Sequence, residues 1–193
     1  NLPSDVCKEI IKRFGEDPTK YPGKTVSGLS PHIKTSIDLP ITSNNRFSDL
    51  DKVLYEQLKV GLKLYFEYLE ITFKNIIGFD NIKRLNKEVF NNTTDTGYTI
   101  QHVKKGDFYN WHSDYSRYAH RLLAFIWYMN KIEDGKGGTT DFYCNKSIQP
   151  EEGKLLIFPA TWTYFHTGVK NESDIDKYIV TGFIEYNSND NTH

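Results

Sequence analysis

The chain has 193 residues and a formal net charge of −1, with 38% hydrophobic, 25% charged and 15% aromatic residues. This composition is typical of one soluble globular domain that is long enough to bury a core of its own. The near-neutral charge provides no basic field for a polyanion, which disfavours a nucleic-acid-binding protein.

The cysteines and the hydrophobic runs restrict the cellular environment. Cys7 and Cys144 are too few for a disulfide scaffold, and their spacing matches no zinc motif. No apolar run approaches the ~20 residues that span a bilayer, and no signal peptide is visible. We therefore expect a cytoplasmic protein without a membrane partner, and the sequence leaves the oligomeric state open.

The first half of the chain carries helical signals. Residues 4–14 predict a short amphipathic helix that Gly15 ends, and residues 48–77 repeat apolar side chains at three- and four-residue steps. Between them, residues 16–48 are rich in Pro, Gly, Ser and Thr, with one possible strand at 32–39. Such a long segment in a compact domain is often a functional lid.

After Asn92 the period changes to that of strands. Seven short strands are predicted, separated by Gly, Asn, Pro or charged turns: 97–103, 108–112, 121–129, 139–143, 154–158, 161–166 and 177–185. Because no helices alternate with these strands, the pattern excludes a doubly wound α/β sheet. It predicts an α+β, mainly β fold: a β-sandwich or jelly roll backed by N-terminal helices. We expect one domain over residues 1–193, with helical support over about 1–92 and the core over about 93–186.

Three residues of this second half could bind a metal. His112 and Asp114 are two residues apart at the end of a predicted strand, so both side chains point to the same side. His166 ends a later strand and supplies a third ligand. Two imidazoles and one carboxylate form the facial triad of non-heme Fe(II) oxygenases, although zinc accepts the same ligands. A surface turn at 112–114 and a packed histidine at 166 are the alternatives.

Lys177 begins the last predicted strand, where it shares one face with Thr181. An ammonium that points into an apolar barrel is costly unless it meets an anion. A dicarboxylate co-substrate would provide that anion, whereas a solvated lysine at the start of the strand is the alternative.

Five motifs in order now point to a family. They are GDFYNWHSD (106–114), RLLAFIWYMN (121–130), GGTTDF (137–142), PEEGKLLIF (150–158), and FHTG (165–168) with DKYIVTGFI (176–184). The chain from about Tyr98 to Tyr186 thereby resembles the 2-oxoglutarate- and Fe(II)-dependent dioxygenases, and most closely their prolyl 4-hydroxylase-like branch. The resemblance implies a double-stranded β-helix, another name for the jelly roll, as the core.

The resemblance also assigns roles to residues of this chain. It gives His112, Asp114 and His166 to Fe(II), and Lys177 to the C5 carboxylate of 2-oxoglutarate, the co-substrate used with dioxygen. Tyr128 falls where relatives place a hydroxyl on that carboxylate, and a core aromatic is the alternative.

One position departs from the branch pattern. A tyrosine is usual three residues before the first glycine of the metal motif, but this chain has Val103 there. Tyr98 or Gln101 on the same strand could replace that co-substrate contact, and Thr181 is a further candidate.

The substrate is the least constrained part of the prediction. Trp111, Tyr115 and Arg117 surround the metal motif, where aromatic and arginine side chains are common recognition anchors. Arg121 matches a position linked to the substrate or the mouth of the site. Ordinary packing and a structural ion pair are the alternatives.

The activity that the resemblance implies is hydroxylation of a C–H bond, coupled to decarboxylation of 2-oxoglutarate to succinate. A prolyl residue of a peptide or protein is the leading substrate, and a free amino acid or another small molecule is the alternative. A jelly-roll metal-binding or sensing module without turnover is a further alternative, which an intact set of ligands and Lys177 argue against.

Overall fold

The computed structural model describes residues 1–25, 28–117 and 119–187. The helices of these residues are α1 (Ser4–Glu16), α2 (Ser48–Ile77) and α3 (Phe79–Asn91), with a short 3₁₀ turn at Asn45–Phe47. The strands are β1 (Tyr21–Pro22), β2 (Ile37–Pro40), β3 (Thr93–Asp95), β4 (Thr99–Val103), β5 (Tyr109–His112), β6 (Arg121–Tyr128), β7 (Thr140–Phe142), β8 (Lys146–Ile148), β9 (Leu155–Pro159), β10 (His166–Gly168) and β11 (Lys177–Tyr186).

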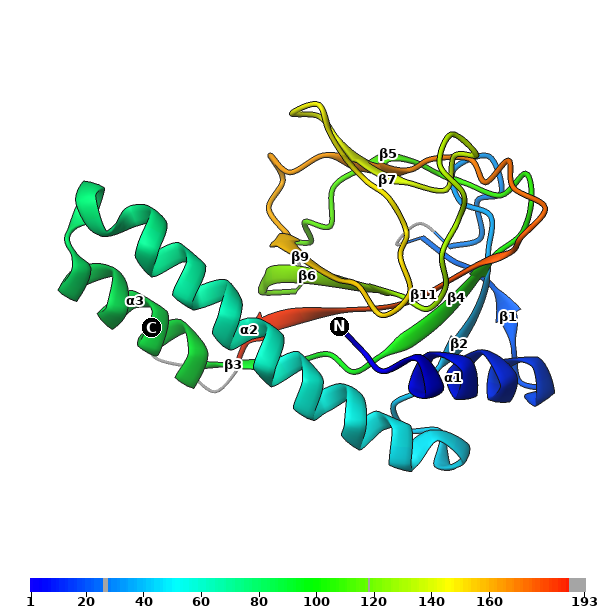
Figure 1. Ribbon diagram of the computed structural model, residues 1–193, viewed down its shortest axis with the longest axis horizontal. Helices are drawn as coiled ribbons and strands as arrows, with labels where there is room; N and C mark the ends of the chain where they lie inside the picture. Colours follow the sequence, from blue (N-terminus) through cyan, green and yellow to red (C-terminus); the bar gives the residue numbers. More distant parts are fainter. Residues whose placement is uncertain (26–27, 118, 188–193) are drawn as a thin grey trace.

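The strands form two antiparallel sheets that face each other. The larger sheet has the order β1-β2-β4-β11-β6-β9, and β3 adds to one end of β11. The smaller sheet has the order β5-β10-β7-β8. Helices α1 and α2 cover the outer face of the larger sheet (Figure 1). The predicted α+β jelly roll backed by N-terminal helices is therefore confirmed.

Alternation along the central strands separates two apolar clusters. In β6, Phe125 and Trp127 pack toward the helices, whereas Ile126 and Tyr128 pack between the sheets. In β11, Val180 belongs to the helix side. Successive side chains of a strand point to opposite faces, so every second residue of these strands faces the space between the sheets. The candidate site residues must come from that second set.

Some predicted elements differ from the observed ones. The expected strand at 161–166 is wrong in its position, because only His166 of this range is in a strand, and β10 continues to Gly168. Residues 161–165 form a turn and loop, in which the Tyr164 backbone N–H donates to the Thr161 carbonyl. The prediction also missed β8 and helix α3, since Gly78 ends α2 and a second helix begins directly after it.

The helical hairpin of α2 and α3 projects beyond the sheets (Figure 1). The first half of α2 buries Leu54 and Leu58 against the larger sheet, whereas its second half packs beside α3. The Asn86 side chain of α3 donates to the Phe66 carbonyl of α2 and holds the two helices together. None of the described helices combines the length and apolar character needed to span a bilayer.

The contact between α2 and the sheet yields a stability prediction. Leu54 is fully buried, so Leu54→Ala removes apolar contacts and leaves a cavity that costs about 2–5 kcal/mol of unfolding free energy. Denaturant titration measures this loss. The exposed Lys52→Ala on the same helix is the control and should change stability by less than about 0.5 kcal/mol. Equal, small effects of both substitutions would contradict this packing.

Candidate metal centre

Two histidines meet through the pairing of β5 with β10. His112 is the last residue of β5, His166 is the first of β10, and the two are direct partners in the antiparallel register. Their ring centroids are 4.2 Å apart, with the ring planes inclined at 57°. Strand pairing alone therefore brings together two potential ligands that are distant in the sequence.

Backbone carbonyls fix the protonation of both imidazoles. The Nδ1 of His112 lies 2.7 Å from the Asn110 carbonyl oxygen, and the Nδ1 of His166 lies 3.2 Å from the Tyr164 carbonyl oxygen. A carbonyl only accepts, so each Nδ1 carries a proton, and the neutral form of each ring then has its lone pair on Nε2. A metal needs such a lone pair, and an Nδ1–H bonded to a carbonyl is the usual support of a metal-ligating histidine.

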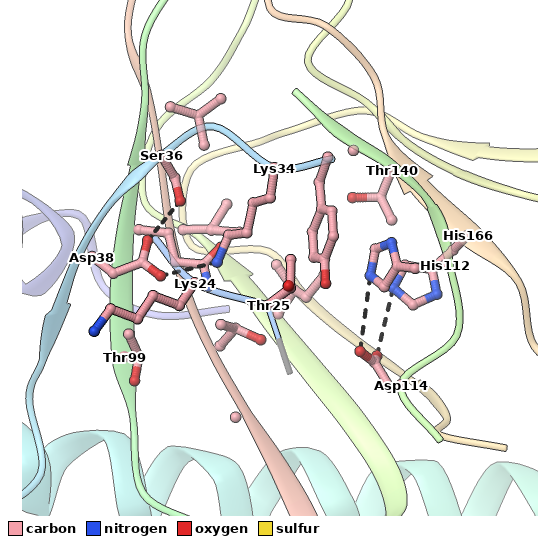
Figure 2. A pocket seen from close by; sticks show the side chains of 18 of the residues that line it. Lys24, Thr25, Lys34, Ser36, Asp38, Thr99, His112, Asp114, Thr140 and His166 are labelled. Carbon is pink, nitrogen blue, oxygen red and sulfur yellow. Dashed lines mark hydrogen bonds and ion pairs between the residues drawn. The ribbon is translucent and has the colours of Figure 1, made fainter. Parts of the chain in front are cut away.

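Asp114 completes the cluster. Its carboxylate lies 3.9 Å from the Nε2 of His112 and 3.5 Å from the Nε2 of His166, as Figure 2 shows. One ligand atom from each residue lies within 4.8 Å of the others, and no other such metal-binding group is found among the described residues. The predicted trio of His112, Asp114 and His166 is thus brought together.

Burial shifts the protonation of the cluster. It lowers the pKa of His112 to about 3, and the neighbouring His166 adds to this effect. Burial also raises the pKa of Asp114. His112 is therefore neutral at physiological pH, as a metal ligand must be.

The donor set fits a divalent transition metal such as Fe(II). Two imidazole nitrogens and one carboxylate converge from one side, as in a two-histidine, one-carboxylate facial triad. All three residues also line a cavity of about 510 Å³ between the two sheets, which leaves room for further ligands.

Lys177 lies in the same cavity at the start of β11. Its side chain is buried, and its Nζ donates to the Gly138 carbonyl at 2.7 Å. No ion pair of Lys177 with a carboxylate occurs among the described residues, and desolvation lowers its pKa to about 8. A buried cation with a single neutral acceptor is suited to an anionic ligand.

The other predicted co-substrate residues fall into different places. Gln101 and Thr181 line the cavity, but the Thr181 hydroxyl already donates to the Phe125 carbonyl at 3.0 Å. Tyr128 is fully buried behind the cavity lining, and its hydroxyl donates to Thr140 Oγ1 at 2.7 Å. Because Thr140 itself lines the cavity, Tyr128 orients this hydroxyl in the present arrangement.

Tyr98 is a correction to the prediction. Its side chain packs on the helix side of the larger sheet, with ring contacts to Phe125 and Trp127. The strand that carries Gln101 into the cavity turns Tyr98 to the opposite face, because the two residues are an odd number apart. Tyr98 therefore cannot supply the hydroxyl that Val103 does not offer to the co-substrate.

The predicted substrate residues lie in two different environments, some exposed at the surface and one in the cavity. Trp111 and Tyr115 are more than half exposed on either side of His112 and Asp114, and Arg117 is exposed further along the same segment. Arg121 lines the cavity and contacts the metal segment, since its Nη1 donates to the Asp114 carbonyl at 3.2 Å.

Arg121 is also held on its other side. Its Nε lies 3.5 Å from a Glu185 carboxylate oxygen, and its guanidinium lies 3.7 Å from the centre of the Phe183 ring. These contacts suit the structural ion pair that was the alternative for Arg121.

The early segment contributes a polar wall that the prediction missed. Lys34 and Asp38 form a buried ion pair at 2.9 Å, and Ser36 donates to the same carboxylate at 2.7 Å (Figure 2). All three line the cavity. Their spacing of two residues within the expected strand at 32–39 was the available signal, because such residues share a face.

Tyr109 connects this polar wall to the candidate metal ligands. The Lys34 Nζ lies 5.5 Å from the centre of the Tyr109 ring, and that ring stacks on His112 at a centroid distance of 3.6 Å. Burial and the nearby Asp114 raise the pKa of Tyr109 to about 12, so its hydroxyl stays protonated.

Comparison with known proteins gives a family match over part of the chain. Residues 98–185, which contain the metal cluster and Lys177, match the family model of the 2OG-Fe(II) oxygenase superfamily. Among curated protein sequences, no significant relative is found.

Solved structures of similar fold cover nearly the whole chain. A prolyl hydroxylase from Trichoplax adhaerens, in complex with a hypoxia inducible factor oxygen degradation domain peptide fragment, is 18% identical with a TM-score of 0.71, over 95% of this chain and 78% of that one. A Pseudomonas putida prolyl-4-hydroxylase is 16% identical with a TM-score of 0.65, over 96% and 89%. The viral collagen prolyl hydroxylase of Paramecium Bursaria Chlorella virus-1 is 16% identical with a TM-score of 0.64, over 97% and 92%.

The geometry predicts how metal binding responds to substitution. Asp114→Ala removes the carboxylate ligand and should weaken Fe(II) or Mn(II) binding by on the order of 100-fold or more, because the loss of supporting groups alone costs 10–100-fold. Anaerobic calorimetric titration measures the affinity. The exposed Asp174→Ala is the control and should bind as the wild type does. Undiminished affinity of Asp114→Ala would place the metal elsewhere.

Proposed function

We propose that this chain, whose residues 98–185 match the family model of the 2OG-Fe(II) oxygenase superfamily, is a member of that superfamily and hydroxylates a prolyl residue in a peptide or protein. The observation that supports the proposal most is the pairing of two features in one cavity. A cluster of His112, Asp114 and His166 lies on one sheet, and the unpaired ammonium of Lys177 lies on the other.

The first role of the chain's own residues is to hold the metal and the co-substrate. His112, Asp114 and His166 would bind Fe(II), and Lys177 would bind the distal carboxylate of 2-oxoglutarate. When bound, Fe(II) supplies the oxidative chemistry that uses dioxygen and 2-oxoglutarate and releases succinate and carbon dioxide. Lys177 contributes orientation, because a charge-assisted hydrogen bond in a buried site fixes one end of a flexible dicarboxylate.

The second role is to keep the ligands in place. Arg121 donates to the Asp114 carbonyl and so holds the backbone of the carboxylate ligand. Tyr109 stacks on the His112 ring and limits its rotation. Held in this way, the ligands need little rearrangement when the metal binds.

The cavity and its surroundings support a peptidyl-proline substrate. Ile126, Phe158 and Ile179 give the cavity an apolar lining that suits the aliphatic ring of proline. Outside it, Trp111 and Tyr115 stand exposed beside the metal ligands, where aromatic surfaces can dock a proline-rich extended peptide. The fold is shared with three prolyl hydroxylases, one of them solved with a peptide.

Lys177 gives a pH prediction. Its pKa of about 8 means that the free enzyme loses the ammonium as pH rises through 8, so binding of 2-oxoglutarate must then recover a proton. The dissociation constant, measured anaerobically with Fe(II), should be flat below about pH 7.5 and rise up to about tenfold per pH unit above 8.

Lys177→Met is the control for this titration. It should bind 2-oxoglutarate at least about tenfold more weakly than the wild type at pH 7 and show no pH dependence in this range. The same rise with pH in Lys177→Met would assign the titration to another group.

Turnover tests the proposed substrate. Purified protein with Fe(II), 2-oxoglutarate, dioxygen and a proline-rich peptide should form succinate and add one oxygen atom to the peptide, detected by mass spectrometry. The same peptide with alanine in place of proline is the matched control. Oxidation of free proline but not of the peptide would replace the peptide by a small molecule as substrate. No succinate under any condition would refute the oxygenase.

A further inference from the structure

The hairpin of α2 and α3 exposes an unusual amount of apolar surface. Among the described residues, eleven large apolar side chains between Tyr55 and Phe90 are 38–72% exposed. At roughly 200 Å² for a large side chain, they leave on the order of 1,000 Å² of apolar surface open. These side chains lie on several sides of the hairpin, so one partner can cover only part of this surface; a stable dimer buries about 800 Å² on each partner.

Four of these residues form one continuous stripe on α2. Val60, Leu64, Tyr68 and Ile71 follow each other at steps of four, four and three, so they lie on one face of the helix. They are 54%, 60%, 62% and 68% exposed, respectively. We call these four residues the α2 stripe.

Within the described part of the chain, no other element packs over the α2 stripe. Helix α3 packs on the side of α2 that carries Phe66, where Asn86 and Phe90 contact it. At ~100° per residue, the α2 stripe is centred on nearly the opposite side of the helix. The hairpin therefore satisfies one apolar side of α2 and leaves the other open.

The charges beside the α2 stripe indicate what covers it. Between Glu56 and Lys74, six charged residues lie within one sector of ~80° next to the stripe: Glu56, Lys59, Lys63, Glu67, Glu70 and Lys74. Their signs reverse about Tyr65. Lys63 lies two residues before Tyr65 and Glu67 two after it, and Glu56 lies nine before and Lys74 nine after.

This order of charges on one α2 is complementary to the order on a second α2 that runs in the opposite direction. If two copies of α2 cross antiparallel near Tyr65, Lys63 of each copy lies against Glu67 of the other, and Glu56 lies against Lys74. A parallel two-fold pair would instead place the charged sectors of the two copies on opposite sides of the seam, where they could not pair.

We propose that the α2 stripe is the interface of an antiparallel homodimer, in which the α2 helices of two copies pack against each other and each α3 stays on the outer side of its own α2. A two-fold interface is self-complementary, and the α2 stripe is so in both its apolar spacing and its charges. The dimer leaves the metal cavity free, because the cavity lies between the sheets and the α2 stripe lies on the projecting hairpin.

The oligomeric state of the full chain tests the proposal. By analytical ultracentrifugation, the wild type should be a dimer at micromolar concentration. Leu64→Glu should raise the dissociation constant by roughly a hundredfold or more, because it places a charge in an apolar seam on both copies. Leu64 is exposed in the single chain, so circular dichroism and Mn(II) binding should stay unchanged and exclude misfolding.

A charge-reversal series tests the antiparallel register. Lys63→Glu should raise the dissociation constant about tenfold, because two attractive pairs become repulsive. The double variant Lys63→Glu, Glu67→Lys restores both pairs and should return to wild-type affinity. Lys8→Glu changes the net charge equally on α1 and should have no effect, since Lys8 is exposed and far from the α2 stripe along the chain.

Three results would overturn the proposal. The first is a monomeric wild type at about 100 μM, which is well above the dissociation constants of typical stable dimers. The second is a dimer that Leu64→Glu leaves intact. The third is a Lys63→Glu defect that the double variant does not restore. Flotation with anionic lipid vesicles covers the remaining explanation. A monomer that floats through the α2 stripe would make this face a lipid-binding surface instead.

Discussion

The antiparallel pairing of β5 with β10 places His112 opposite His166, and the candidate site depends on this one register. A shift by one residue would turn either imidazole to the other face of the smaller sheet. The same pairing places Asp114 just beyond the end of β5, where its carboxylate reaches both Nε2 atoms. Backbone carbonyls then select the tautomer of each histidine, so the metal-binding form is set before any metal arrives.

The two faces of the larger sheet carry different side chains and have different roles. Toward the helices, side chains such as Phe125 and Val180 supply a dry core that holds the sheet in shape. Toward the smaller sheet, the same strands present Gln101, Thr181 and the buried ammonium of Lys177. Burying that ammonium costs free energy, and the rigid sheet keeps the side chain from turning out to solvent. A carboxylate bound in the cavity would offset this cost. The polar wall at the β2 edge of the same sheet is different in kind, since Lys34 and Asp38 neutralise each other there.

Much of this could be predicted from the sequence, and the failures have physical causes. The ligands and Lys177 follow from period-two strands and from motifs in a fixed order, so the trio and its neighbouring cation could be found. Tyr98 was placed in the cavity wrongly because it is an odd number of residues from Val103, and residues at such a spacing face opposite sides of a strand. The polar wall was missed although Lys34, Ser36 and Asp38 alternate within the expected strand, because alternation alone does not say which face of that strand lines the cavity. Helix α3 escapes prediction because Gly78 ends α2 and the segment that follows is polar on average, although its few apolar residues repeat at helical steps.

A crystal structure of the protein with Mn(II) and 2-oxoglutarate tests the central claim most directly. We predict anomalous density for one metal bounded by His112, Asp114 and His166, with a carboxylate of 2-oxoglutarate on the Nζ of Lys177. A metal bound away from this trio, or a co-substrate that leaves Lys177 bonded only to the Gly138 carbonyl, would contradict the assignment of the site.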